Sequence, residues 1–535
     1  MHLCAAVCPS AGNGVKRLCY RALVPVDSTH LDYDTTATAW LRARDVFAGE
    51  DAVKAAGVRY LPRLDSQTDD EYLAYKSRAS FFNATARTAD GFVGLIFRRE
   101  PTVELPAGGS GVGRALGNFA EDADMLGTAL SAYAKNVVCE VIGVGRAGTL
   151  VDWEGEVEQR AYAVLYTAEQ IINWRVARVN GRNILSLVVL KECGTPGAGG
   201  GTCVSSQRSG ESAEGDGFVT EMVEQIRVLK LEQVQSLESG VQSQESGDVR
   251  RSADRRYEYR VELWRRVRSD KRRGKPEWQL VETRIPLRLG KPLPQIPFVF
   301  HGPRHSLPDL DKLPLADIIA VNLDHYRLNA DYHHGLHFTA LPTAWVSGFD
   351  KSATLRIGSS TAWVSETAGA TAGFLEFTGQ GLTTFERAMD RDERLMAVLG
   401  TRMLEGQKRV GETADAIELR QSGENSVLNA VSLSVSDSLT HVLRWVYWWN
   451  STEATPEAIG EDQVLVQLNT DFSAKGMASA ELKAVVGAWQ AGAFSRETML
   501  ELFRRGEVLP AGRSNEEEVR LTAEGQRAEG GGQTN

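Results

Sequence analysis

The chain has 535 residues, which is more than one compact core usually holds, so about two or three domains are expected. Hydrophobic residues make up 42% of it and charged residues 24%, as in ordinary globular proteins, so the composition excludes a chain that is disordered throughout. The formal net charge of -10 argues against broad wrapping by nucleic acid, although an acidic wall would let DNA slide past.

No membrane span, secretion signal or metal-binding cysteine pattern is predicted. The sequence has no run of 18 apolar residues, and the apolar part of the opening segment "MHLCAAVCPSAGNGVKRLCY" is too short for a signal peptide. The six cysteines show no C-x-x-C spacing, so we interpret them as thiols in a reducing compartment. A cytosolic protein or part of a soluble assembly is expected.

The first 300 residues predict helices followed by strands. Aromatic and aliphatic residues recur at helical spacing between 33 and 105, and a further helix is predicted at about 112–135. The β-branched segment "AKNVVCEVIGVG" then predicts a buried strand, and residues 136–300 are rich in strand patterns. Two segments rich in Gly, Ser and charge, 193–217 and 236–256, are predicted loops. The fold class is therefore α+β.

Long helices are predicted after residue 313. The first begins near Pro314 and ends near residue 338, and a turn-rich stretch with β patches follows at 341–378. A second helix over 382–405 has an apolar seam with spacings of three and four, interrupted only by Asp392. The predicted packing residues of this seam are Leu382, Phe385, Met389, Met396, Leu399 and Met403.

Further helices are predicted at about 424–449, where the pattern ends in the aromatic cluster "WVYWW", and at 477–506. The tail from about Ser514 is rich in Gly and Glu and is predicted to be disordered.

The stretch "DYHHGLHFTALP" allows two interpretations. His333 and His337 are four residues apart and would share one face of a helix, so with Asp331 they could hold the metal of a metal-dependent hydrolase. Alternatively, the stretch is the end of a structural helix, where the helix dipole favours histidines and Gly335 weakens the helix. No P-loop, H-E-x-x-H or G-x-S-x-G motif is present to support an enzyme.

Three segments in order resemble a family of tailed-bacteriophage portal proteins that was long catalogued only as a domain of unknown function. They are "YLPRLDSQTDDEYLAYKSRASFFNATARTADGFVGLIFRREP", "PLADIIAVNLDHYRLNADYHHGLHFTALPTAWVSG" and "FLEFTGQGLTTFERAMDRDERLMAVLGTRML". The resemblance covers about residues 30–450, and the leader and the Gly/Ser-rich insertions depart from it.

The resemblance implies a portal fold with a wing, a two-helix stem, a small clip and a helical crown, with copies arranged in a ring. The implied regions are a disordered leader at 1–30, an N-terminal wing at 31–313, a first stem helix at 314–340, a clip at 341–378, a second stem helix at 379–405, a tunnel loop at 406–420, a C-terminal wing helix and strand at 421–474, a crown at 475–513 and a disordered tail at 514–535.

The resemblance also implies a function. A dodecameric ring at one capsid vertex would pass double-stranded DNA during packaging and ejection, with Lys408 and Arg409 of the tunnel loop near the DNA. The expected partners are the terminase large subunit, head-completion or adaptor proteins, and the major capsid and scaffolding proteins. No catalytic residue, cofactor, metal or membrane contact is expected. The expected locations are the virion and, during assembly, the host cytoplasm. The rival hypotheses are the hydrolase and a monomeric helical scaffold or adaptor.

Overall fold

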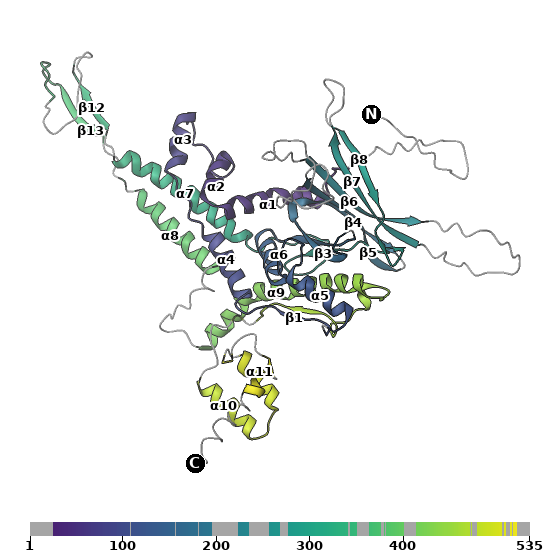
Figure 1. Cartoon of the computed structure of the whole chain (residues 1–535). Coiled ribbons are helices and arrows are strands. Elements are labelled where there is room, and N and C mark those ends of the chain that lie inside the picture. Colours follow the sequence, from purple (N-terminus) through teal and green to yellow (C-terminus); the bar gives the residue numbers. More distant parts are fainter. Residues whose placement is uncertain are drawn as a thin grey trace, which may run out of the picture. The chain divides into compact units, whose positions relative to one another are not determined.

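The structure is a computed structural model in which two compact units can be described (Figure 1). Unit 1 comprises Met1–Thr38, Phe92–Lys312 and Thr413–Asn535, and unit 2 comprises Ala39–Gly91 and Leu313–Glu412. The residues described are 25–107, 109–155, 157–179, 181–194, 223–234, 256–267, 277–340, 343–349, 363–375, 379, 381–400, 414–470, 472, 479–505, 508–509, 514–515 and 517–521.

The chain is α+β, as predicted. Its helices are α1 (Leu31–Ala48), α2 (Glu50–Ala56), α3 (Asp69–Arg78), α4 (Ala84–Ile96), α5 (Gly111–Glu121), α6 (Leu130–Val144), α7 (Ala316–Ala340), α8 (Leu382–Leu399), α9 (Ala414–Asn450), α10 (Ser479–Gln490) and α11 (Arg496–Arg505), with short 3-10 turns η1 (Gly57–Arg59), η2 (Ala168–Gln170) and η4 (Pro456–Ala458). Its strands are β1 (Thr102–Glu104), β2 (Ala147–Glu154), β3 (Arg160–Thr167), β4 (Ile171–Val179), β5 (Arg182–Gly194), β6 (Val223–Val234), β7 (Arg256–Val267), β8 (Glu277–Arg284), β9 (Leu287–Arg288), β10 (Lys291–Pro292), β11 (Phe298–His301), β12 (Thr343–Ser347), β13 (Thr371–Leu375) and β14 (Leu465–Gln467).

The two units group residues differently from the regions implied by the resemblance. That division placed 31–313 in one wing, but Ala39–Gly91 clusters in space with Leu313–Glu412. The implied leader, Gly/Ser-rich loops, tunnel loop and tail lie largely outside the described residues, except that α9 already begins at Ala414 and takes in residues predicted as loop. In the described part of the chain, no helix is long and apolar enough to cross a membrane.

The predicted strand "AKNVVCEVIGVG" is wrong, because these residues belong to helix α6. Its buried residues include Tyr133, Val137, Val141 and Val144, which recur every three or four positions and so form one helical face. β-branched residues favour strands only weakly, and packing of an apolar face outweighs that preference. The helix ends at Gly145, whose φ of 77° is the left-handed conformation that glycine adopts readily.

Among the described residues of unit 1, two antiparallel sheets have three or more strands. The larger has the order β4-β5-β6-β7-β8, and the smaller has the order β11-β2-β3. One face of the larger sheet packs Ile172, Val189, Ile226 and Val228 together, with Val26 and Tyr33 from the segment before and within α1 lying against them. Alternation along each strand sends the neighbouring side chains to the opposite face.

That opposite face carries a buried network of charges that connects the two sheets. Arg227 of β6 donates from Nε to the Glu192 carboxylate of β5 at 2.8 Å, and Tyr166 of β3 donates to the same carboxylate at 2.6 Å. Asp152 of β2 pairs with Arg284 of β8 at 2.5 Å. Burial alone would lower the pKa of Arg227, but the Glu192 charge raises it well above its ordinary value. Each buried charge thus has an opposite partner, which its desolvation requires.

A buried chain of hydrogen bonds crosses unit 1 at His301. The Ser438 hydroxyl donates to the Val435 carbonyl at 3.0 Å, so it accepts from His301 Nδ1 at 2.7 Å. His301 Nε2 then accepts from the Thr149 hydroxyl at 2.6 Å, and Thr149 accepts from the Tyr133 hydroxyl at 2.8 Å. This series of hydrogen bonds requires a neutral His301 imidazole. Burial lowers the pKa of that imidazole to about 3, so it is neutral at physiological pH.

Helix α9 holds strand β14 through two side chains. The backbone N–H of Val466 donates to the Thr440 hydroxyl at 3.0 Å, and that of Leu468 donates to the Ser436 hydroxyl at 2.9 Å. Four helical residues rise about 6 Å and two strand residues about 6.7 Å, so hydroxyls four apart match N–H groups two apart. Strand β1 pairs with β14 in an antiparallel register through Thr102–Glu104. The serine-rich pattern of α9 therefore satisfies strand groups as well as its own carbonyls.

Replacing Arg227 with methionine is expected to lower the free energy of unfolding by about 3–5 kcal/mol, because Glu192 would be left as a buried charge without its cation. Denaturant unfolding of unit 1, followed by tryptophan fluorescence, measures the loss. Lys191→Met is the matched control, since it removes an exposed ion pair with Glu224 in the same two strands and should cost less than about 1 kcal/mol. Equal losses in the two variants would contradict the prediction.

The pH dependence of stability is expected to carry the signature of His301. Its folded-state pKa of about 3 lies below the ordinary value of 6.5, so the unfolded chain alone binds this proton between the two values. The contribution of neutral His301 to the free energy of unfolding is therefore fully present above pH 6.5. It falls by about 1.4 kcal/mol per pH unit as the pH decreases toward 3. His301→Gln should show a shallower profile over this window, and parallel profiles for the two proteins would refute the assignment.

Candidate functional site: helices α7 and α8

Helix α7 joins the two sequence segments of unit 2 through polar side chains. Asn322 is fully buried; its Oδ1 accepts from the Thr85 hydroxyl at 2.8 Å and from the Thr85 N–H at 3.2 Å, and its Nδ2 donates to the Phe82 carbonyl at 2.6 Å. About two turns further along the same face of α7, Asn329 Oδ1 accepts from the Ser80 N–H at 2.7 Å. Residues 79–83 lie in neither helix nor strand, so α7 satisfies backbone groups that secondary structure leaves unpaired.

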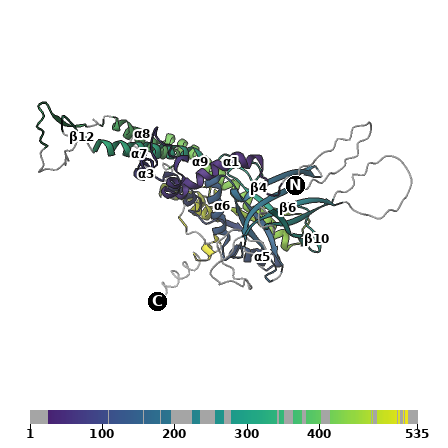
Figure 2. The ribbon, with the colours of Figure 1, turned by 90° about the horizontal axis from the view of Figure 1, so that it is seen from above.

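Two further α7 side chains bind residues elsewhere in the segment Ala39–Gly91. Arg327 donates from Nε to the Tyr60 carbonyl at 2.9 Å, and the Tyr75 hydroxyl of α3 donates to Asp331 at 2.5 Å. Burial first, and then the Asp331 hydrogen bond, raise the pKa of Tyr75 far above its ordinary value. Helix α3 is itself well defined, because Thr68 and Glu71 form a reciprocal capping box at its start. In Figures 1 and 2, α7 lies between α3 and α8.

Helices α7 and α8 approach closely where one of them has glycine. A Cβ placed at Gly335 of α7 would lie 2.8 Å from Leu382 Cδ2 of α8, so Leu382 fills the space that this glycine leaves. At the other end, Gly400, which follows α8, leaves room for Thr88 of α4 and Ile318 of α7. Gly335 lies in the last turns of α7, which continues to Ala340, and it also forms part of the contact with α8.

The predicted seam of α8 is buried in the middle and exposed at its end. Met396 is 2% exposed and packs in the core, whereas Leu399 is 42% exposed. Leu382, Phe385 and Met389 are half-buried. Asp392, which interrupts the apolar pattern, is as buried as Met396, at 4%. Met403, Lys408 and Arg409 lie outside the described residues.

The histidine stretch forms contacts with aromatic rings. His334 lies edge-on to Tyr75 and to Phe338, with ring centroids 5.2 and 4.8 Å apart, and burial lowers its pKa. His333 lies against Tyr332 and His337 against Phe338. Among the residues that the structure describes, no three His, Cys, Asp or Glu side chains are grouped to hold a metal ion. The hydrolase hypothesis thus has no three-ligand site at Asp331, His333 and His337.

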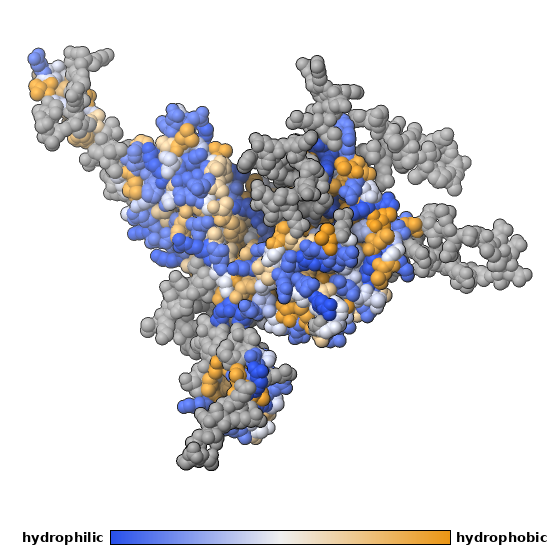
Figure 3. Space-filling view, in the orientation of Figure 1, coloured by the Kyte–Doolittle hydropathy of each residue, from blue (hydrophilic) through white to orange (hydrophobic). Residues whose placement is uncertain are grey.

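Between α7 and α8 the chain forms the hairpin β12–β13, which lies beyond the ends of the two helices in both ribbon views (Figures 1 and 2). The β patches predicted within 341–378 are confirmed. Trp345 and Phe374 are about half exposed on this hairpin, at 46% and 52%. Elsewhere over α3 and α8, hydrophilic residues predominate in the view of Figure 3.

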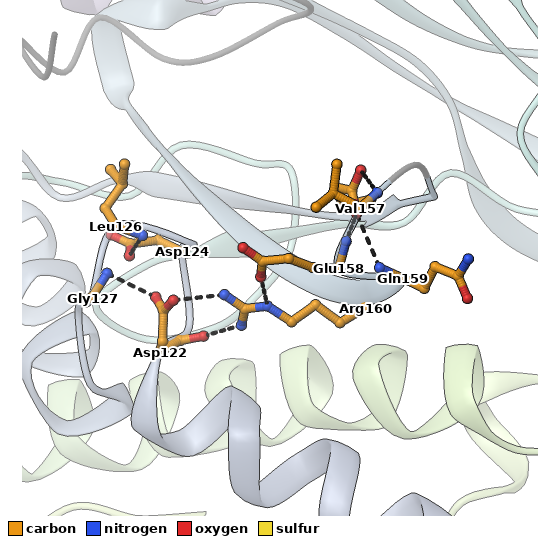
Figure 4. A network of polar contacts seen from close by, with 9 residues as sticks. Asp122, Asp124, Leu126, Gly127, Val157, Glu158, Gln159 and Arg160 are labelled. Carbon is orange, nitrogen blue, oxygen red and sulfur yellow. Dashed lines mark hydrogen bonds and ion pairs between the residues drawn. The ribbon is translucent and has the colours of Figure 1, made fainter. Parts of the chain in front are cut away.

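A second polar feature, in unit 1, braces two surface loops (Figure 4). Arg160 donates to the Asp122 carboxylate and carbonyl and to the Glu158 carboxylate, each at 2.6 Å. Partial burial would raise the pKa of Asp122, but the hydrogen bond from the Gly127 N–H and the arginine lower it. The loops expose Leu126 and Val157. Because the carboxylates are occupied by local donors, the arrangement is a structural brace.

Comparison with protein families gives a match that covers the sequence from α7 to α9. A family model described as "Domain of unknown function (DUF4055)" matches residues 314–450. No curated protein matches the chain. Among solved structures, a chain of the virion of a native gene transfer agent (GTA) particle is similar, with 10% identity, a TM-score of 0.38 and coverage of 86% of this chain and 99% of that chain. A chain of the neck of an empty GTA particle has 10% identity, a TM-score of 0.35 and the same coverage. TM-scores below 0.5 do not establish a common fold.

Sequence reasoning missed Asn322 and Asn329. The available signal was the position of Asn322 on α7, next to Leu323 and four residues before Tyr326, both of which are buried. A polar residue on a buried stripe requires a partner, but the partner segment is more than 230 residues away in the chain.

Asn322→Leu is expected to destabilise unit 2 by about 3 kcal/mol, because it leaves the Thr85 and Phe82 groups buried without partners. Hydrogen exchange of the amides of residues 79–88 measures the effect locally, and exchange there should accelerate. Asn329→Leu is the milder comparison, since it removes one bond to an exposed N–H and should cost about 1 kcal/mol. Unchanged exchange in Asn322→Leu would contradict the assigned role of α7.

Proposed function

We propose that the chain is a portal-type protein of a tailed bacteriophage or a related particle, whose copies form a ring around a DNA channel at one capsid vertex. In this proposal the ring passes double-stranded DNA during packaging and ejection and does no covalent chemistry. Dodecameric stoichiometry and docking of terminase, head-completion, capsid and scaffolding proteins belong to the same proposal, as does a virion location after assembly in the host.

The observation that carries the proposal is the order helix, hairpin, helix within unit 2. The resembling segments imply two stem helices joined by a small clip, and α7, β12–β13 and α8 have that order and that arrangement. A resemblance in sequence does not require the hairpin to lie beyond the helix ends, so its position supports the proposal independently.

The charge of the chain is compatible with DNA passage. A net charge of -10 gives a surface that repels a polyanion and would let it slide. Lys408 and Arg409 are proposed as weak positive contacts to the passing DNA.

The full-length chain is expected to form closed rings with a central channel, because a head-to-tail contact between copies closes when its rotation divides a full turn. Negative-stain microscopy shows the channel, and mass photometry of the same sample gives the number of copies. Globular proteins of known mass calibrate the mass measurement. Monomers alone, at micromolar concentration and across low and moderate salt, would refute the portal proposal and favour the adaptor hypothesis.

A further inference from the structure

The exposed surface of α8 carries two charged strips with the same spacing. Glu386, Asp390 and Glu393 form an acidic strip, and each is followed by an arginine that belongs to a basic strip. The basic strip comprises Arg387, Arg391 and Arg394, and all six side chains are exposed. Both strips therefore repeat with intervals of four and then three residues.

The two strips occupy different sides of the helix. Successive residues turn by about 100°, so members of each strip stay within about 60° of one another while the strips lie about 100° apart. The buried residues Asp392 and Met396 lie on the side opposite the arginines. The basic strip thus points away from the α7 contact, and the acidic strip follows one flank of that contact.

The acidic flank is anchored to α7. The Tyr332 hydroxyl donates to Glu386 at 2.8 Å, and His325 Nε2 lies 3.5 Å from Glu393. Among the described residues of one copy, the contacts of these arginines are long, from Arg391 to Asp392 at 3.6 Å and from Arg394 to Asp390 at 3.8 Å. Arg391 and Arg394 are 74% and 79% exposed, so such pairs contribute little. Most of the interaction capacity of the arginines remains available.

We infer that the basic strip of α8 in one copy binds the acidic strip of α8 in the next copy, as the recognition contact between neighbours. Parallel helices aligned with a shift of one residue would place three arginines opposite three carboxylates. Leu395, Val398 and Leu399, each 42–43% exposed, continue this surface with apolar area that a neighbour would cover. The contact is head-to-tail, because it joins two different surfaces, and this inference rests on the proposed ring.

A second copy fits this surface better than nucleic acid does. A phosphate backbone that approached the arginines would also meet the acidic strip beside them, and like charges repel. A neighbouring α8 satisfies both strips at once with the same spacing. The contact is charged and exposed, so it should weaken as salt increases.

Charge reversal tests the contact in the full chain. The acid-reversed variant carries Glu386→Lys, Asp390→Lys and Glu393→Lys, and the base-reversed variant carries Arg387→Glu, Arg391→Glu and Arg394→Glu. In each variant both strips carry charges of the same sign, so the α8 surfaces of neighbouring copies repel each other. The fraction of protein in rings should therefore fall about tenfold or more. The variant with all six changes restores opposite signs and should recover rings, as should an equimolar mixture of the two triple variants.

The control is Arg175→Glu with Arg178→Glu and Arg182→Glu, which makes the same change in net charge as the base-reversed variant, at exposed positions of unit 1, and should leave the ring fraction unchanged. Circular dichroism checks that each variant is folded. Rings formed by the native chain and retained in both triple variants would overturn the α8 contact and leave the portal proposal standing. Base-reversed rings that assemble normally but lose binding to duplex DNA would assign the strip to nucleic acid and also overturn it. Absence of rings in the native chain would overturn both proposals.

Discussion

The fold of unit 2 depends on hydrogen bonds from one helix to a distant, irregular stretch of backbone. Residues 79–83 lie between α3 and α4 with no ladder or helix to pair them, and burying unpaired backbone groups is costly. Asn322 and Asn329 of α7 supply the missing partners. This requirement brings Ala39–Gly91 against Leu313–Glu412 and makes α7 the central element that α3 and α8 both contact.

Unit 1 meets the same requirement with charges and hydroxyls. Glu192 and Arg227, together with Asp152 and Arg284, form a neutral set between two sheets, and His301 passes hydrogen bonds from α6 to α9. Thr440 and Ser436 supply strand β14 with acceptors on its helix side. Fully paired polar groups of this kind allow only a narrow range of packings, because any shift leaves a buried group unsatisfied.

Helix α8 buries a charged side chain and exposes an apolar one. Its most buried residues are a carboxylate, Asp392, and Met396, whereas Leu399 in the same apolar pattern is exposed. In the proposed ring, a helix that contacts both its own α7 and a neighbouring copy would need two separate surfaces. In the proposed ring, the matched charged strips would specify which surface meets which.

The sequence by itself determined the α+β class, the helices that begin near residues 314 and 382 and the one that ends near residue 449, and the strands between Ala147 and residue 300. The reason is that burial of one face imposes periods of 3.6 and 2 on the residues. It did not determine α6, where valines suited to strands form a helical face. Only the tertiary structure decided that residues 39–91 join α7, that Asn322 is a buried connector and that Leu399 is exposed. The physical reason is that periodicity records which side of an element is apolar, whereas the partner of a buried polar group and the cover of an apolar one depend on segments far away in the chain.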